Sequence, residues 1–171
     1  MLIFNIEKLN YFNQQYLKML GDDQIYDRLV ALGRIPSDGV RGSYAKAIRL
    51  VRERAVTLLD FSDLFSFVFE LPAYEPTILV WKKGTSEGAR ENLTRCRDVL
   101  NSVEEGEWVK EKFEQGITAL ADQYGKGDVF WPLRVALSGK EQSPAPLDIA
   151  EALGKTETLR RVDLALTKLA S

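Results

Sequence analysis

Few residues in this chain could carry out acid–base, nucleophilic or metal chemistry. The 171 residues include no histidine, which removes the commonest general base at neutral pH and the commonest metal ligand. The single cysteine, Cys96, can form neither an intramolecular disulfide nor a cysteine-based zinc site. No nucleophilic side chain has a recognisable base beside it. The sequence therefore predicts no catalytic residue and no metal site.

The segment Gly154-Lys155-Thr156 has the ending of a phosphate-binding loop without its beginning. The pattern G-x-x-x-x-G-K-T requires glycine at position 149, where this chain has Ile149 inside an expected helix. Gly139-Lys140 fails the same test. We interpret Gly154 as the C-cap of one helix, followed at once by the N-cap of the last helix.

Clusters of acidic and aromatic side chains have structural explanations that compete with functional ones. The acidic clusters fall at turns or helix starts, where carboxylates favour the helix dipole, so we assign them to capping and solvation rather than to acid–base catalysis. Four phenylalanines share one short apolar helix and are expected in the core rather than as platforms for RNA bases. The acidic residues are Asp22, Asp23, Glu104, Glu105 and Glu107, and the phenylalanines are Phe61, Phe65, Phe67 and Phe69. Trp131 stays open between the two roles.

Arginine is the residue type here that is best suited to reading RNA. Its planar guanidinium has five donors, which can bind a base edge or phosphate in bidentate fashion or stack on a base. Arg54 lies at the border of an apolar stripe near Leu50, so its stem can pack while its head reaches a groove. The alternative for Arg54 is a solvated arginine or an ion pair with Asp60. Because the net charge is only -2, any RNA contact must be a local patch.

The spacing of apolar residues predicts an all-α fold. Hydrophobic residues make up 45% of the chain, enough for a core, and almost none of them alternate with the period of a strand. Helices are expected over residues 9–20, 25–32, 44–58, 60–69, 86–103, 106–124, 130–138, 144–153 and 156–169. Pro132 is placed near the start of its helix, and residues 77–81 are left unassigned.

Two prolines within residues 71–76 predict a boundary between two helical subdomains, over residues 1–75 and 76–171. No apolar run approaches the roughly 20 residues that span a bilayer. The start of the chain reaches polar residues too soon for a signal peptide. We therefore expect a soluble cytoplasmic protein without a membrane partner.

Residues 131–139, Trp-Pro-Leu-Arg-Val-Ala-Leu-Ser-Gly, are followed by Gln142-Ser143-Pro144 and by Leu153-Gly154-Lys155-Thr156. This block resembles the C-terminal region of bacterial glutamyl-tRNA synthetases in both residues and spacing. Residues 7–16 are similar to the family's segment leading out of the catalytic half. Arg52-x-Arg54 with Thr57-Leu58 is similar to its helix before the phenylalanine-rich one. The resemblance covers nearly the whole chain and is weakest over residues 77–128.

The resemblance implies an all-α anticodon-binding region, a bundle or cage of two successive helical subdomains that reads the anticodon of glutamate tRNA. It implies that Arg54 recognises the third anticodon base, where arginine favours cytosine, and that Arg134 stacks on or contacts the anticodon bases. It also implies that the first two anticodon bases are bound at the start of the penultimate helix, by Ser143, Pro144 and Pro146. Of these contacts Pro146 is the least secure, because proline has no N–H to donate and many relatives have leucine there. Supporting RNA contacts are expected from Arg52, Trp131 and Lys140.

The ATP-binding signatures of class I synthetases are missing from this sequence. The H-I-G-H type is impossible without histidine, and no K-M-S-K-S type occurs. The resemblance places the catalytic domain before Met1, so ATP and magnesium would belong to that domain. The parent would be an ATP-dependent glutamate–tRNA ligase, but this chain alone is expected neither to activate glutamate nor to bind a cofactor.

The partners implied by the resemblance are the anticodon loop of glutamate tRNA and the catalytic domain of the same synthetase. The chain itself is expected to be a monomer. If the resemblance is set aside, the alternative is a helical adaptor domain for protein interactions with no RNA role. That alternative predicts an exposed apolar patch and no positive cluster.

Overall fold

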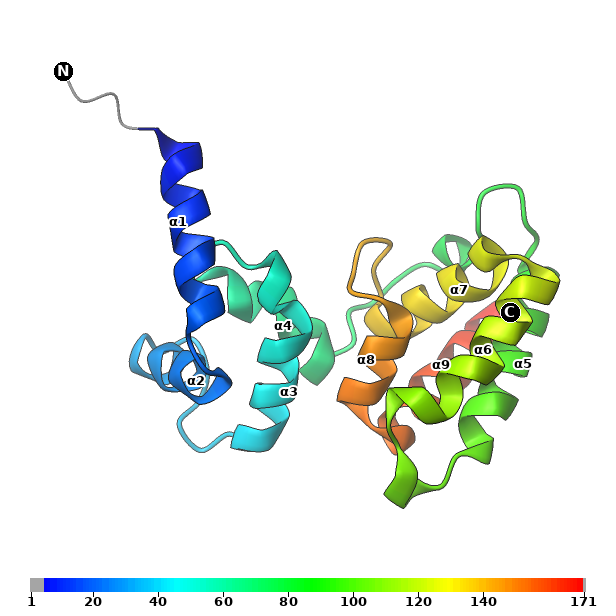
Figure 1. Cartoon of the computed structure of the whole chain (residues 1–171). Helices are drawn as coiled ribbons and strands as arrows, with labels where there is room; N and C mark the ends of the chain where they lie inside the picture. Colours follow the sequence, from blue (N-terminus) through cyan, green and yellow to red (C-terminus); the bar gives the residue numbers. More distant parts are fainter. Residues whose placement is uncertain (1–4, 171) are drawn as a thin grey trace. The chain divides into compact units, whose positions relative to one another are not determined.

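The computed structural model describes residues 5–170, and over this range it is built from α-helices and short 3₁₀ helices without a strand (Figure 1). The all-α prediction is confirmed. The α-helices are α1 (Ile6–Met19), α2 (Asp22–Ala31), α3 (Arg41–Val51), α4 (Asp60–Phe69), α5 (Ser86–Ser102), α6 (Lys110–Tyr124), α7 (Lys126–Ser138), α8 (Pro146–Leu153) and α9 (Lys155–Leu169). The 3₁₀ helices are η1 (Arg52–Arg54), η2 (Pro76–Leu79) and η3 (Glu105–Glu107).

The chain divides into two compact units, of which the first ends at Phe69 and the second begins at Glu70. Residues 70–75 belong with the second unit because Tyr74 packs there. The ammonium of Lys168 in α9 donates to the Tyr74 carbonyl at 3.2 Å and lies 5.0 Å from the centre of its ring. That residues 1–75 and 76–171 are two successive anticodon-binding subdomains stays a prediction.

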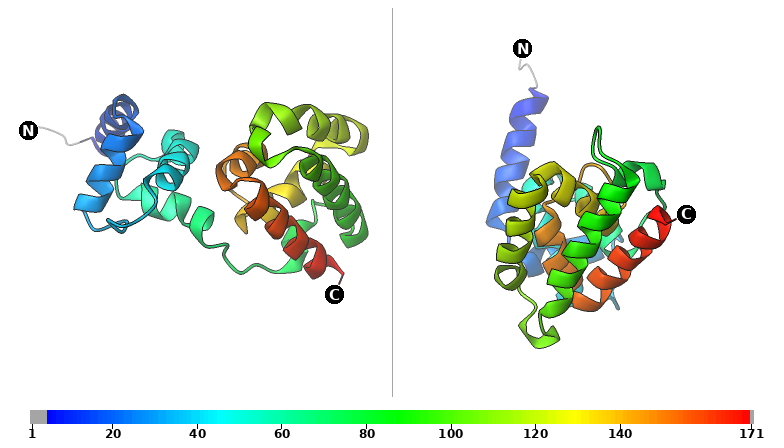
Figure 2. Two further views of the ribbon diagram at one scale, coloured as in Figure 1. Left: turned by 90° about the horizontal axis from the view of Figure 1, so that it is seen from below. Right: turned by 90° about the vertical axis from the view of Figure 1, so that its right-hand side faces the viewer.

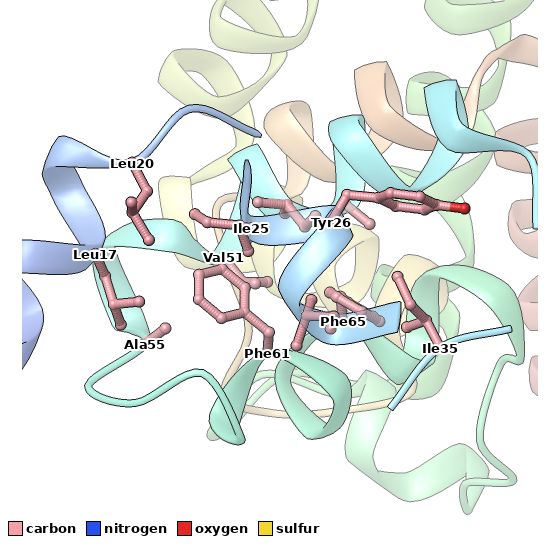
Figure 3. Close-up of a cluster of buried hydrophobic side chains, with 12 residues drawn as sticks. Leu17, Leu20, Ile25, Tyr26, Ile35, Val51, Ala55, Phe61 and Phe65 are labelled. Atoms are coloured by element: carbon pink, nitrogen blue, oxygen red, sulfur yellow. The ribbon is translucent and has the colours of Figure 1, made fainter. Parts of the chain in front are cut away.

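The first unit encloses a core to which all four of its α-helices contribute (Figure 3). Phe61 and Phe65 of α4 point into this core beside Val51 of α3. Phe67 is also buried, so the core role predicted for the phenylalanines is confirmed for three of the four. Phe69 is instead 44% exposed and packs against the ring of Tyr44, with 4.4 Å between the ring centres. Each fully buried side chain of this size contributes about 1.5–3 kcal/mol to folding.

Helix α1 is covered only at its end. Leu17 and Leu20 are buried in the first unit's core, whereas Leu9 is 42% and Phe12 55% exposed, and Tyr16 is exposed as well. The apolar spacing from 9 to 20 correctly predicted a helix and its apolar face. Spacing alone carries no information on whether another element covers that face.

The second unit is built around α7, seven of whose thirteen residues are buried. Helices α5, α6, α8 and α9 all pack on it, and α5 and α9 lie side by side (Figure 2). Cys96 of α5 lies in this interior, where burial raises the pKa of its thiol to about 12 and keeps it an uncharged packing group.

Several predicted helix limits in the second unit differ from those observed. Helix α7 begins at Lys126 rather than at residue 130, and α6 begins at Lys110, after the separate turn η3, rather than at residue 106. The unassigned segment 77–81 includes all of η2 except its first residue, Pro76. Gly154 is the C-cap of α8, as predicted. No α-helix among residues 5–170 is long and apolar enough to cross a membrane.

Candidate nucleic-acid interface

Arg54 lies at the end of η1, the short 3₁₀ helix that follows α3. The α-helix expected over residues 44–58 ends at Val51, and Ala55 is already extended. The cause is Asp60, whose carboxylate accepts the backbone N–H groups of Val56 and Thr57 at 2.9 and 2.8 Å and the Thr57 hydroxyl at 3.0 Å. These bonds replace those that a longer helix would make.

Asp60 does not form the ion pair that was considered for Arg54, because its carboxylate accepts hydrogen bonds from Val56 and Thr57 instead. Burial of the Asp60 carboxyl opposes ionisation, but the hydrogen bonds from Thr57 and Val56 outweigh it and lower its pKa. Arg54 itself is exposed and makes no side-chain hydrogen bond or ion pair with any of residues 5–170. The helical wheel placed Arg54 where its stem could pack near Leu50. Its side chain is instead exposed, because the helix has ended before it. The guanidinium is therefore available to a ligand.

Both arginines of α3 are engaged by acidic residues of α2, whereas Lys46 of the same helix is exposed and makes no ion pair with residues 5–170. Arg41 contacts Asp23 and Asp27, and Arg49 contacts Asp22. Arg52 also pairs with Asp22, at 2.5 Å, and its Nε is buried without a partner. The positive charge of the three arginines is thus largely neutralised. A supporting RNA contact by Arg52 stays a prediction, and its guanidinium would have to be shared with Asp22.

Pro132 lies in the middle of α7, not near its start as predicted. A proline inside a helix has no N–H to donate to the carbonyl four residues earlier, which here belongs to Asp128. The side-chain amide of Asn92 in α5 donates to that carbonyl at 3.1 Å and replaces the missing bond. Asn92 is itself buried, and its side-chain oxygen accepts from Arg95 at 2.9 Å. This substitution lets α7 continue through the proline to Arg134.

Replacing Asn92 with leucine is expected to lower the free energy of unfolding of the second unit by about 1–3 kcal/mol. The physical reason is that the carbonyl of Asp128 would remain buried without a donor. Urea unfolding followed by tryptophan fluorescence measures this effect, because all three tryptophans of the chain lie in the second unit. A leucine variant as stable as the parent would contradict the role of Asn92, and Thr94→Ala, on the exposed face of α5, is a suitable control.

Arg134 lies two residues beyond Pro132 on α7 and is half-buried. Its Nε is enclosed without any hydrogen-bond partner, and its side chain makes no hydrogen bond or ion pair with residues 5–170. A buried guanidinium nitrogen without a partner is costly, so its neighbours do not explain why the site has an arginine. An acceptor brought by a ligand would offset part of that cost.

The turn after α7 carries the predicted contacts to the first two anticodon bases. Ser138 closes the turn, because its hydroxyl donates to the Arg134 carbonyl at 2.8 Å and accepts the N–H of Lys140 at 3.1 Å. Gly139 adopts the left-handed conformation, with φ at 66°. Ser143 is only 4% exposed, and its hydroxyl donates to the Pro144 carbonyl at 3.1 Å. The single hydroxyl proton of Ser143 is thus used within the chain, and its oxygen is left to accept from a ligand.

Helix α8 begins at Pro146, which occupies its first position. Proline suits this position because its missing N–H would have no partner within the helix. The N–H groups of Leu147 and Asp148 then remain free of intrahelical bonds. The carboxylate of Asp148 is held by Lys110 at 2.7 Å. Pro146 itself is buried, so a contact from it would be apolar.

Trp131 has a structural role that accounts for its position. Its indole N–H donates to the Ile78 carbonyl at 2.8 Å, and its ring packs on Trp81 at 4.5 Å. The structure thus brings Arg134, Trp131, Lys140 and the Ser143 turn onto one continuous α7–turn–α8 segment of the second unit, whereas Arg52 and Arg54 belong to the first unit. Roles of these residues in RNA contact stay predictions.

Sequence reasoning missed Asn92 and Trp81, both of which support α7. Nothing in the sequence indicated the role of Asn92, because a polar residue on a polar helix is expected to be exposed. Trp81 could have been noticed, because it precedes Lys82-Lys83-Gly84 and combines an aromatic ring with positive charge. No group of three or more Cys, Asp or Glu residues in the described range could hold a metal ion.

A family model described as an anticodon binding domain matches residues 24–166. This chain belongs to the anticodon binding domain family. The matched range includes the 131–156 block and extends over parts of both units of the structure.

The anticodon binding domain is similar to part of known glutamate–tRNA ligases. The ligase of Roseiflexus castenholzii is 31% identical over 178 residues, which cover 98% of this chain and 35% of the ligase. That of Clostridium tetani is 32% identical, again covering 98% of this chain and 35% of the ligase. The crystal structure of a glutamate tRNA ligase from Elizabethkingia meningosepticum in complex with its amino acid superposes with a TM-score of 0.77 and 26% identity over 97% of this chain and 33% of that one. The chain thus spans about a third of the length of these relatives.

Proposed function

We propose that this anticodon binding domain reads the anticodon of glutamate tRNA for a glutamate–tRNA ligase. The observation that carries the proposal is the match of residues 24–166 to a family of anticodon binding domains, in which Arg54 and Arg134, like Arg34, have no side-chain partner among residues 5–170. Most other arginines are paired with carboxylates, as Arg41, Arg97 and Arg160 are. A guanidinium without an internal partner retains its full capacity for a base edge or phosphate.

In this proposal Arg54 contacts the third anticodon base and favours cytosine. Arg134 stacks on or contacts the anticodon bases, and Ser143, Pro144 and Pro146 contact the first two. Activation of glutamate, with ATP and magnesium, takes place in a catalytic domain of the same ligase, and this chain performs no chemistry. We expect it to act as a single copy in the cytoplasm.

Arg54→Gln is expected to reduce the preference for cytosine over guanine at the third anticodon position by about 5-fold or more. A well-placed base contact is worth about 1–3 kcal/mol of discrimination, which glutamine on a shorter stem would lose. Fluorescence anisotropy with labelled glutamate tRNA and its guanine variant, at several salt concentrations, measures both affinities. Arg134→Gln should weaken binding of both RNAs together.

The matched control is Arg34→Gln in the first unit. Arg34 is also exposed and has no side-chain partner among the described residues, so its loss tests for the effect of charge alone. It should leave the cytosine preference unchanged. If Arg54→Gln discriminates the two bases as well as the parent does, the role of Arg54 is wrong. If the parent binds glutamate tRNA no better than a tRNA with an unrelated anticodon, the proposed function is wrong.

A further inference from the structure

A cavity of about 320 Å³ lies at the beginning of α7, and nothing in the proposed function uses it. Its walls come from the loop before α5, from α5, from the end of α6 and from the first turns of α7, and we call it the Trp81 cavity. The lining residues that matter here are Trp81, Asn92, Arg95, Tyr124, Asp128 and Pro132. In Figure 1 the green loop that precedes α5 stands beside the start of α7. The volume is at the small end of the range for ligand pockets, about 300–1,000 Å³.

Trp81 forms a fixed aromatic wall of this cavity. Its ring packs against Trp131, whose indole N–H is held by the Ile78 carbonyl. Gly127 allows the ring to approach the α7 backbone, because a Cβ there would lie 2.1 Å from the Trp81 Nε1. A ring held on two sides loses little freedom when a planar ligand stacks on it.

Arg95 and Asp128 give the cavity polar groups of both signs. Arg95 donates to Asn92 and to Glu91, at 2.9 and 3.1 Å, and lies 4.1 Å from the centre of the Tyr124 ring. The carboxylate of Asp128 makes no hydrogen bond or ion pair with residues 5–170 and is only partly exposed. A free carboxylate beside a stacking surface accepts from an amino group, such as the N4 group of cytosine.

Positive charge adjoins the cavity on its open side. An open depression of about 680 Å³ shares Trp81 and Asp128 with the cavity and is also lined by Lys82 and Lys83. Neither lysine has a carboxylate partner in the described part of the chain, and the Lys82 ammonium lies 4.6 Å from the centre of the Trp81 ring. A base that stacks on Trp81 would displace this flexible side chain, and its ammonium would then meet the phosphate of the same nucleotide.

Arg134 lies beyond the cavity along α7. Asp128, Trp131 and Arg134 follow one another at intervals of three residues, so at about 100° per residue Trp131 lies about 60° from each of the other two, and Asp128 and Arg134 are about 120° apart around the helix axis. Asp128 and Arg134 are separated by about 9 Å along the axis, from a rise of about 1.5 Å per residue. This is more than the ~3.4 Å between stacked bases, so a nucleotide in the cavity and a base at Arg134 would not be neighbours in one stack.

We infer that the Trp81 cavity binds one unpaired base of the RNA, outside the anticodon triplet, that carries an amino group. The base stacks on Trp81, its amino group donates to Asp128, and its phosphate lies beside Lys82 and Lys83. The inference rests on the proposed function, since it adds a second contact to the RNA that Arg134 binds. Uracil has no amino group and is the base that the cavity disfavours.

The test uses the complete 171-residue chain and the anticodon stem-loop RNA of glutamate tRNA. Each unpaired base outside the triplet is replaced in turn by uracil, and the dissociation constant is measured for the parent and for Trp81→Leu. One replacement is expected to weaken binding to the parent about tenfold, or ~1.4 kcal/mol. Trp81→Leu should bind the original RNA about tenfold more weakly and should not respond to that replacement. Asp128→Asn should lose only the discrimination against uracil.

Binding by a folded Trp81→Leu variant that equals the parent's, with no sensitive base outside the triplet, would overturn the inference. If that variant does not fold, the ¹⁵N-indole NMR signal of Trp81 in the unsubstituted chain decides, and a signal that does not move on adding the RNA overturns it. Arg134→Gln separates the two proposals. A loss of affinity with Arg134→Gln but none with Trp81→Leu contradicts the cavity alone, whereas a parent that does not bind the RNA contradicts the proposed function.

Discussion

Replacing Glu157 with alanine is expected to lower the free energy of unfolding of the second unit by about 3 kcal/mol. Glu157 accepts from Arg160 and, at 2.6 Å, from Arg161, whose side chain is only 1% exposed. Removing one partner of a buried ion pair costs about 3–5 kcal/mol because the remaining charge has lost its counter-ion. The lower end of this range applies, since Arg161 also donates to the Leu137 carbonyl at 2.6 Å and would keep that bond.

The same pair makes stability depend on pH at the acidic end. Hydrogen bonds from Arg160 lower the pKa of Glu157 most, burial opposes the shift, and Arg161 adds to it, so the pKa falls from 4.5 to about 2. A carboxyl whose pKa is lower when folded stabilises the fold fully above its unfolded pKa. Its contribution is lost as the pH falls from about 4.5 towards 2. Glu157→Ala should therefore differ most from the parent near neutral pH and least near pH 2.

Glu87→Ala is the matched control for this prediction. Glu87 accepts two bonds from Arg90, three residues ahead, just as Glu157 does from Arg160, but both Glu87 and Arg90 are exposed. Exposed pairs contribute about 0–1 kcal/mol, so the control should remain close to the parent. Urea unfolding followed by tryptophan fluorescence compares the two variants between pH 2 and 7. Equal effects of the two substitutions would show that burial of Arg161 is not what makes Glu157 important.

Arg161 also illustrates which features the sequence could not predict. Glu157, Arg160 and Arg161 have the spacing of a solvated helical ion-pair cluster, and nothing local distinguishes the arginine that is buried. Its burial depends on partners distant in the sequence, among them the Leu137 carbonyl. Asn92 is a similar case, because its value depends on a proline 40 positions further along the chain. Features that depend on distant contacts cannot be read from helical periodicity.

Features set by neighbouring residues were predicted well. Helical spacing gave the all-α class, and Gly154 gave the end of α8, because a glycine can adopt the positive φ that follows a helix. The end of α3 was missed because the hydrogen bonds of Asp60 compete with helical ones, and an aspartate at that distance gives no warning. As a result Arg54 was predicted on a helical surface and is found on an exposed 3₁₀ turn.

Gly139→Ala is expected to lower the free energy of unfolding of the second unit by about 2–5 kcal/mol. Gly139 has φ at 66°, a left-handed conformation that costs a residue with a Cβ about 1–2 kcal/mol. The added Cβ would also lie 2.8 Å from the Cγ and 2.9 Å from the carbonyl oxygen of Pro72. Because Pro72 is a rigid residue and one of the two atoms is backbone, relief requires a shift of the 139–145 turn or of the segment before η2. Overpacking of this kind costs about 1–3 kcal/mol.

Two control variants separate the causes of this loss. Gly33 has nearly the same φ, 64°, but nothing lies within 4 Å of an added Cβ there. Gly33→Ala should therefore lower the free energy of unfolding of the first unit only by the cost of the left-handed conformation. Circular dichroism measures this effect. Gly139→Asn keeps the contact with Pro72 while asparagine tolerates the left-handed conformation, so it should lose only the packing part. If Gly139→Asn is as stable as the parent, Pro72 does not press on this turn. Since the turn carries Ser143 and Pro144, Gly139→Ala should also weaken RNA binding, whereas Gly33→Ala should leave the contacts made by the second unit unchanged.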